Sequence, residues 1–344
     1  MQPFFLHFFQ SLSNLLIFVY MNKDQYLHSI IQEAISSIEY PQTAKNLFAP
    51  IQYTLSMGGK RIRPLLTLMS TKLFGGDIEK AITPAIGIET FHNFTLLHDD
   101  LMDNADMRRN NPTVHKKWDA NTAILSGDAM QIMAYQMIAK APAANLEQAI
   151  SLFSNTAIEI CEGQQYDMEF ETRDDVSKDE YIEMIRLKTA VLLGCALKMG
   201  AIIAGADYKD AELIYTFGEK IGLAFQLKDD LLDTYADEAK FGKRIGGDIL
   251  NNKKTYLMLS ALEASSEVQL KEAMSWMSLT DYVDQDKISF FVDLYNKTNA
   301  AKQCEDLMDL YYKQGMEALK AINVEEASKN ELYTLANNLM YREL

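Results

Sequence analysis

Residues 89–103, ETFHNFTLLHDDLMD, and residues 221–235, IGLAFQLKDDLLDTY, decide the fold. In both stretches apolar residues recur at spacings of three and four, which is typical of a helix with a buried face. The same spacing continues in YLHSIIQEAISSI and ALKMGAIIAG, while alternating strand-like runs are scarce. The sequence therefore predicts an all-α protein.

The breaks predicted between these helices are short. They lie at Pro41, Pro50, Gly58-Gly59, Pro64, Gly75-Gly76, Pro84, Asn110 to Pro112, Ala141-Pro142 and residues 173–178, 204–207 and 238–252. No long linker separates two halves, and no solenoid repeat is present. Although 344 residues would allow about two domains by length, we expect one domain over residues 21–344, a helical bundle around a central cavity.

Residues 3–20, PFFLHFFQSLSNLLIFVY, are apolar enough to suggest a signal peptide or a membrane anchor. They lack the positive start and small-residue cleavage site of a secretory signal. Polar Gln10, Ser11, Ser13 and Asn14 interrupt the run, which makes a spanning helix costly. We interpret residues 1–20 as a non-native or upstream-initiated extension, with a real membrane segment as the alternative.

The overall charge limits the partners that the protein can have. With 48 acidic and 33 basic side chains the net charge is -15, which repels nucleic acid and anionic membrane surfaces. The three cysteines, Cys161, Cys195 and Cys304, have no paired spacing for zinc or a redox pair. We expect a cytoplasmic protein with no nucleic-acid partner and no stable membrane anchoring.

The first acidic motif is Asp99-Asp100-Leu101-Met102-Asp103. Residues four apart share a helix face, so Asp99 and Asp103 project side by side and repel one another unless a cation lies between them. Oxygen ligands without nearby thiolates suit magnesium, which shares its remaining positions with waters and phosphates. A solvated acidic turn would show the same pattern, so this motif alone leaves both interpretations open.

The same spacing recurs at Asp229-Asp230-Leu231-Leu232-Asp233. Carboxylates flanked by Leu and Phe are costly to bury without a partner. Two such motifs therefore favour helices that line a shared polar cavity containing cations.

Basic residues accompany both motifs. GGKRIRP, residues 58–64, combines a flexible turn, cations and a helix start, which suits a diphosphate, although a basic surface turn is the alternative. Arg108 and Arg109 follow the first motif, and the second is surrounded by Lys228, Lys243, Arg244, Lys253 and Lys254. This alternation of acids and bases is what a metal-bridged diphosphate requires.

The order of the motifs is specific. GGKRIRP, ETFHNFTLLHDDLMDNADMRRNNPTVH, AILSGD, GQQYD, LKTA, GLAFQLKDDLLD, FGKRIGGD and NNKKT resemble, in this order, the motif series of the trans-prenyl diphosphate synthases. The resemblance covers roughly Lys45 to Ala261. One departure is Asn110, where the family usually has glycine, which leaves the shape of this loop open.

The resemblance implies a role for each matching residue. Two magnesium ions would bind Asp99 and Asp103 with support from Asp100, and a third would bind Asp229 with Asp233. The allylic diphosphate would contact Arg108, Lys188, Lys243 and Lys253, and isopentenyl diphosphate would contact Gly59, Lys60, Arg63, His92 and Arg109. Thr189 and Gln226 would lie near the developing allylic cation, and the catalytic set would be Asp99, Asp103, Lys188, Thr189, Gln226 and Asp229. His98 and His115 are interpreted as structural.

The resemblance also implies the reaction. The allylic carbon–oxygen bond breaks, the double bond of isopentenyl diphosphate attacks the cation, and the released diphosphate takes the proton. Apolar residues exclude water, which would quench the cation. The family is typically homodimeric, so a homodimer is expected.

Product length depends on the residues below the first motif. Thr95 and Phe91 lie one and two helical turns below Asp99, with Phe94 beside them. In similar enzymes an aromatic residue five positions before the first aspartate stops growth at the geranylgeranyl length. We therefore expect geranylgeranyl diphosphate, with farnesyl diphosphate as the second choice.

Two other functions remain as alternatives. A terpene cyclase shares the helical fold, but cyclases usually lack GGKRIRP and carry a different second motif. A non-catalytic partner subunit would be expected to have lost an aspartate motif or the arginine pair, and here all are intact. The sequence therefore favours chain elongation.

Overall fold

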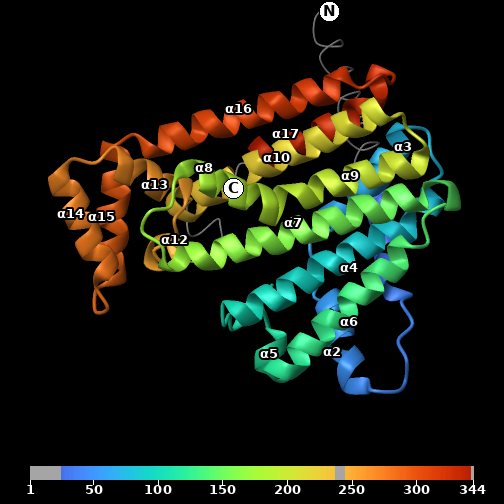
Figure 1. The fold of residues 1–344 in the computed structure, drawn as a ribbon, viewed down its shortest axis with the longest axis horizontal. Helices are drawn as coiled ribbons and strands as arrows, with labels where there is room; N and C mark the ends of the chain where they lie inside the picture. Colours follow the sequence, from blue (N-terminus) through green and yellow to red (C-terminus); the bar gives the residue numbers. More distant parts are fainter. Residues whose placement is uncertain (1–24, 237–244, 342–344) are drawn as a thin grey trace, which may run out of the picture. The chain divides into compact units, whose positions relative to one another are not determined.

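The computed structural model describes residues 25–236 and 245–341 (Figure 1). The interpretation of residues 1–20 and the role expected for Lys243 lie outside these ranges. Within them helices dominate, and the only strands described are β1 (Met107–Arg108) and β2 (Asn111–Pro112). The prediction of an all-α fold is confirmed.

The described residues form two compact units, residues 25–150 with 199–205 and residues 151–198 with 206–236 and 245–341. The first contains a helix over residues 25–36, α2 (Lys45–Ser56), α3 (Ile62–Leu73), α4 (Ile78–Met102), the β1–β2 hairpin, α5 (Val114–Lys117), α6 (Ala120–Ile138) and η1 (Ala143–Asn145). The expectation of one domain stays a prediction.

Helix α4 is the centre of the first unit. Its buried residues lie on all sides of the helix, as expected of a helix enclosed by others. Helices α4 and α6 pack closely at Gly87, where a Cβ would lie 3.0 Å from Cβ of Met137. This packing fixes the helix that carries the first aspartate motif.

The second unit is also helical. It contains most of α7 (Leu146–Thr172), then α8 (Lys178–Ile185), a π-helical turn (Arg186–Ala190), the start of α9 (Val191–Ala204), α10 (Tyr208–Tyr235), α12 (Gly247–Leu250), α13 (Tyr256–Glu263), α14 (Glu267–Ser278), α15 (Asp284–Lys297), α16 (Ala300–Ala321), η3 (Glu326–Lys329) and α17 (Asn330–Tyr341). Helices α10 and α16 lie side by side along much of their length (Figure 1). Their packing fixes the helix that carries the second aspartate motif.

Two of the predicted helix breaks lie in helix interiors, and a third, Pro64, lies in the first turn of α3. Pro50 lies inside α2 and Pro84 inside α4, and both prolines are buried. A proline within a helix removes one backbone hydrogen bond, and the packing of its neighbours offsets this loss. Around Pro84 these neighbours include Ala81 and Ala85, neither of which is exposed to solvent.

The chain at the arginine pair forms a tight hairpin turn. Arg109 and Asn110 have φ angles of 51° and 59° between β1 and β2. Two successive residues with positive φ match the turn type that twists in the same sense as a hairpin, and asparagine tolerates this conformation well. Asn110 therefore forms the turn without glycine.

One helical stretch in the described ranges, Lys178–Ala204, is long and apolar enough to cross a membrane. The protein itself buries 78% of the most apolar window of this stretch, and core helices of soluble proteins meet the same criteria. All three cysteines are free, with Cys195 and Cys304 buried and Cys161 exposed.

Candidate active site

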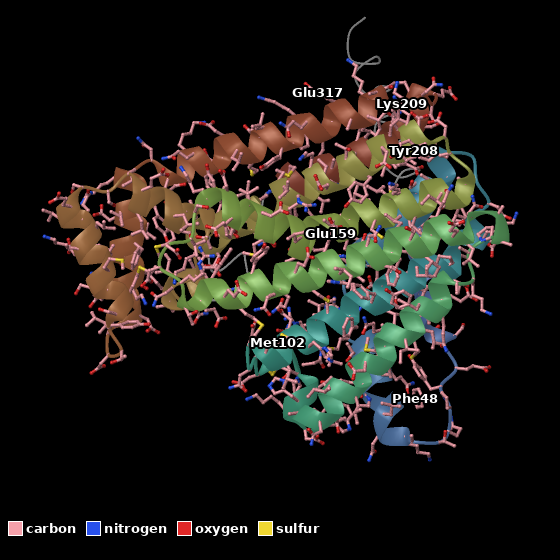
Figure 2. All side chains as sticks on the ribbon, in the orientation of Figure 1. Phe48, Met102, Glu159, Tyr208, Lys209 and Glu317 are labelled. Carbon is pink, nitrogen blue, oxygen red and sulfur yellow. The ribbon has the colours of Figure 1, made fainter. Side chains whose placement is uncertain are left out.

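The first aspartate motif lies at the C-terminal end of α4. Asp99 and Asp100 belong to the last turn, and Asp103 caps it, its N–H lying 2.9 Å from the carbonyl oxygen of Asp99. Met102, labelled in Figure 2, is 51% exposed. A helix C-terminus carries partial negative charge, and the last turn of α4 has no basic residue. Carboxylates in this position favour a bound cation.

The middle aspartate has a different environment from its neighbours. Asp100 is only 5% exposed and accepts hydrogen bonds from Nε and Nη2 of Arg108 at 2.9 and 2.6 Å. Burial raises the pKa of Asp100, although Arg108 opposes this effect. The Arg108 guanidinium also lies 3.6 Å from Asp99. Asp100 therefore holds Arg108 beside the motif.

A cluster of cations surrounds His92 within the first unit. Burial, and then the fields of Arg63, Arg109, Arg108 and Arg61, lower the pKa of His92 well below its usual value. The imidazole is therefore neutral at pH 7 and has one N–H to donate. Burial lowers the pKa of Arg63 to about 10. Such clustered positive charge is expected at a site for an anion.

The glycine turn fits closely against the arginine pair. Gly59 has a φ of 125°, and a Cβ there would lie 2.8 Å from the guanidinium carbon of Arg109. Arg109 donates a hydrogen bond to the carbonyl oxygen of Gly58. Glycine is therefore required at position 59 both by its φ angle and by the approach of Arg109.

A small pocket adjoins this cluster. Its polar wall includes Asn93, Asp100, Arg108 and Arg109, and its apolar wall includes Leu96. The pocket thus lies beside both the aspartate turn and the cations of the first unit.

The second aspartate motif lies in the last two turns of α10. Asp233 accepts a hydrogen bond at 3.0 Å from the backbone N–H of Asp248, which belongs to α12. Burial and then the charge of Asp233 raise the pKa of Asp248 to about 6, with smaller contributions from Asp167 and Asp229, while Lys253 opposes the rise. The carboxylates of Asp233, Asp167 and Asp229 thus all act electrostatically on Asp248. Such a group of four carboxylates favours a bound cation, as at the first motif.

The middle aspartate of this motif is buried. Asp230 is 4% exposed and accepts hydrogen bonds from the Tyr181 hydroxyl and, at 3.3 Å, from Nε2 of Gln226. Burial raises the pKa of Asp230 to about 8. Thr189 in turn lies 3.4 Å from Oε1 of Gln226. Asp230 therefore orients Gln226, and through it Thr189.

Lys188 lies in the π-helical turn of the second unit. Its Nζ forms an ion pair of 2.6 Å with Asp167 of α7. A Cβ at Gly163 would lie 2.4 Å from the backbone nitrogen of Lys188, so the glycine allows α7 to approach this turn. π-Helical turns are frequent at functional sites, where they redirect side chains.

Two of the residues expected to limit product length, Phe91 and Phe94, form an aromatic cluster with His98. The rings of Phe91 and Phe94 are 5.3 Å apart, and the edge of His98 packs 4.8 Å from Phe94. Phe91 is 1% exposed and Phe94 8%. Thr95 is half-buried and donates a hydrogen bond to the carbonyl oxygen of His92. Phe94 is therefore held in a fixed position below the first motif.

The predicted site residues form one group in each of the two units. The first unit places Gly59, Arg63, His92, Asp99, Asp100, Asp103, Arg108 and Arg109 around α4, with exposed Lys60 at the glycine turn. The second places Asp229, Asp233 and Lys253 in one electrostatic group, and links Lys188 to Asp167 and Thr189 to Gln226. Sequence reasoning gave no role to Glu89, Asp167, Tyr181 or Asp248. Asp167 is the last residue of the motif GQQYD, and Asp248 is the last residue of FGKRIGGD. These two residues could therefore have been found from the motifs.

The donor set fits magnesium. In the described ranges no three side chains of His, Cys, Asp or Glu converge as a complete metal cage. Magnesium commonly binds through one or two carboxylates and completes its shell with waters and substrate phosphates. Paired carboxylates at helix C-termini, near fixed cations, supply that kind of incomplete shell.

These features define a class: helical enzymes that act on diphosphates with divalent metal ions. A sequence model of the family described as polyprenyl synthetase matches residues 44–295. The geranylgeranyl pyrophosphate synthase of Geoglobus acetivorans is 41% identical over 242 residues, 70% of this chain and 76% of that protein. The geranylfarnesyl diphosphate synthase of Natronomonas pharaonis is 38% identical over 258 residues, 70% of this chain and 76% of that protein.

A solved structure agrees with these relatives. A crystal structure of a geranylgeranyl pyrophosphate synthase is 45% identical to this chain and has a TM-score of 0.88, over 93% of this chain and 99% of the other. The chain belongs to the polyprenyl synthetase family, and the prediction of a trans-prenyltransferase is confirmed.

Proposed function

We propose that this enzyme condenses isopentenyl diphosphate with dimethylallyl, geranyl or farnesyl diphosphate, and that its main product is geranylgeranyl diphosphate. The observation that carries the proposal is the layout of α4. His92, with its cations, and Asp99 lie seven residues apart on this helix. Seven residues span about 10 Å and return to the same face. One helix thus offers places for two diphosphates, with room between them for the carbons that join.

In this proposal the basic residues hold the substrates in fixed positions. Arg63, His92 and Arg109, with Lys60, bind isopentenyl diphosphate. Arg108, Lys188 and Lys253, joined by Lys243, bind the allylic diphosphate. These fixed charges stabilise negative charge on the leaving group as the carbon–oxygen bond breaks.

Magnesium is the metal that we propose, with three ions per active site. When bound, it neutralises charge on the departing diphosphate. Asp99 and Asp103 would hold two ions, supported by Asp100, and Asp229 with Asp233 would hold the third. Thr189 and Gln226, whose side chains contact each other, then face the developing cation. The leaving diphosphate accepts the proton that the adduct loses.

The main test is an assay with labelled isopentenyl diphosphate and each allylic diphosphate, with and without magnesium. We expect chain elongation that requires the metal, and dephosphorylated products that co-migrate mainly with geranylgeraniol. Cyclic hydrocarbons would indicate a terpene cyclase. Turnover only with a second type of subunit would indicate a partner protein.

Product length gives a sharper test, at Phe94. Phe94→Ala is expected to move the main product from geranylgeranyl to geranylfarnesyl or longer diphosphates, because truncation removes a fixed aromatic wall below Asp99. Chromatography of the products under matched turnover measures the change. Phe153→Ala, which truncates a fully buried phenylalanine of α7, is the control for loose packing. An unchanged product spectrum for Phe94→Ala contradicts the assignment of this wall.

We also propose that the protein is a homodimer and that α6 lies in its interface. Ile124, Leu125 and Ile132 of α6 are 44%, 60% and 61% exposed. Residues at these spacings share one side of a helix, and such an apolar patch is typical of an interface. A cytoplasmic location without stable membrane anchoring completes the proposal.

The dimer predicts a defined change in mass. Wild type should sediment at about twice the chain mass of 39.1 kDa, and the double variant Leu125→Glu/Ile132→Glu at the mass of one chain. Buried glutamates at an apolar interface are costly because they lose solvation. Val268→Glu changes a side chain that is 74% exposed on α14 and serves as the control. A double variant that sediments as wild type would place the interface elsewhere.

A further inference from the structure

Glu89 is a buried carboxylate beneath the cation cluster of the first unit. It lies in α4, one turn before His92, and is 2% exposed. Its Oε1 lies 2.6 Å from Nη1 of Arg61, which is 3% exposed. Burial of a lone charge is strongly unfavourable, so each of these two charges depends on the other.

The ion pair fixes the glycine turn. Arg61 lies between Lys60 and Arg63, and its φ of 49° is in the left-handed region. This conformation is strained for a residue with a side chain and persists only where the surroundings hold it. Glu89 provides such a contact. Arg61 itself is too buried to meet a substrate, so it serves to shape the backbone that presents Lys60 and Arg63.

The same carboxylate is also linked to Arg109, through hydrogen bonds of the Asn93 side chain. Nδ2 of Asn93 donates to Oε1 of Glu89 at 3.0 Å, and Oδ1 of Asn93 accepts from Nη1 of Arg109 at 3.5 Å. Asn93 is 1% exposed, so its amide has few alternative orientations. The same NH2 group also donates to the backbone carbonyl oxygen of Glu89 at 2.8 Å. Both bonds place the NH2 group toward Glu89, which turns the amide oxygen toward Arg109.

Glu89 also acts on the cluster through its charge. Its field favours the charged forms of both Arg63 and Arg109, against burial and their mutual repulsion. The negative charge of Glu89 thus offsets part of the repulsion among these cations before a diphosphate binds.

We propose that Glu89 is a positioning residue that preorganises the isopentenyl diphosphate site, through Arg61 for the glycine turn and through Asn93 for Arg109. The inference rests on the proposed function, because it assigns these cations to that substrate. Glu89 does not touch the substrate. Its effect is therefore expected on one substrate only.

The decisive variant is Glu89→Gln, which keeps the shape and the acceptor oxygen but removes the charge. KM for isopentenyl diphosphate is expected to rise between about 10-fold and about 100-fold, because misplaced binding groups cost that much. KM for the allylic diphosphate and kcat at saturation should change by less than about threefold. Calorimetric titration of isopentenyl diphosphate alone should show the same weakening without any reaction.

Two further variants separate positioning from general damage. Asp210→Asn changes another buried carboxylate, in the second unit, which accepts a hydrogen bond from the backbone N–H of Asn323. This variant should leave both KM values within about twofold of wild type. Asn93→Ala leaves the Arg61–Glu89 pair intact and should raise only KM for isopentenyl diphosphate. If Glu89→Gln does not fold, the KM values of Asn93→Ala test the proposal in its place.

Each result has one meaning. A selective rise in KM for isopentenyl diphosphate supports the proposal. Unchanged KM values, or equal losses for both substrates, overturn it. A wild-type enzyme that does not elongate allylic diphosphates would instead overturn the proposed function, which the same assay reports independently.

Discussion

Asp99→Asn and Asp103→Asn are each expected to lower kcat by roughly 1,000-fold or more, while the protein remains folded. Both carboxylates lie in or next to the last turn of α4, which carries the partial negative charge of the helix dipole and contains no basic residue of its own. Arg108, 3.6 Å from Asp99, is the cation beside them. An amide is a much weaker ligand for magnesium than a carboxylate. The leaving diphosphate would therefore lose the charge neutralisation that its departure requires. Steady-state kinetics at several magnesium concentrations measure the effect.

Asp106→Asn is the matched control for this prediction. It makes the same chemical change just beyond the motif, where the Asp106 side chain is 82% exposed and pairs with Lys116 at 3.0 Å. Exposed ion pairs contribute little, so kcat should stay within about twofold of wild type. Melting temperatures of all variants should agree within a few degrees, because asparagine keeps the shape of aspartate and neither Asp99 nor Asp103 is fully buried. If either motif variant retained a tenth of the activity, its proposed role as a metal ligand would be wrong.

The fold was predictable because helical periodicity extends along most of the chain. Single prolines were the weak point of that prediction. Pro50 and Pro84 were expected to end helices, but α2 and α4 continue through them. Local propensity cannot show how much packing surrounds a residue, and buried neighbours such as Ala81 and Ala85 offset the missing hydrogen bond.

Spacing alone identified the acidic and basic motifs, but it did not distinguish the aspartates within them. Asp99 and Asp100 are adjacent in sequence, yet only Asp100 is bound closely by Arg108. In the second motif Asp230 faces the Tyr181 hydroxyl, a residue 49 positions earlier in the chain. Such partners come from tertiary packing, which a motif does not contain. For the same reason Glu89, which resembles an ordinary helix residue in sequence, was not identified.

Asp229→Asn is expected to lower kcat by about 1,000-fold and to raise the magnesium concentration needed for half-maximal rate. Asp230→Asn makes the same change at the adjacent position of α10. Because Asp230 is 4% exposed and contacts Tyr181 and Gln226, its loss should leave the magnesium requirement unchanged. Equal shifts in magnesium requirement for the two variants would contradict this division of roles.

The double variant Asp103→Asn/Asp229→Asn tests whether both motifs act on one leaving group. Independent contributions to the barrier would multiply, giving a loss of about a million-fold. Groups that act as a unit are strongly non-additive, because the first removal already disables the shared step. We therefore expect the double variant to be no more than about tenfold slower than the slower single variant. Single-turnover rates with saturating allylic diphosphate make the comparison, since they exclude product release. A multiplicative loss would mean that the two motifs serve separate steps. It would contradict the proposal that both sets of carboxylates act on the ionisation of one diphosphate.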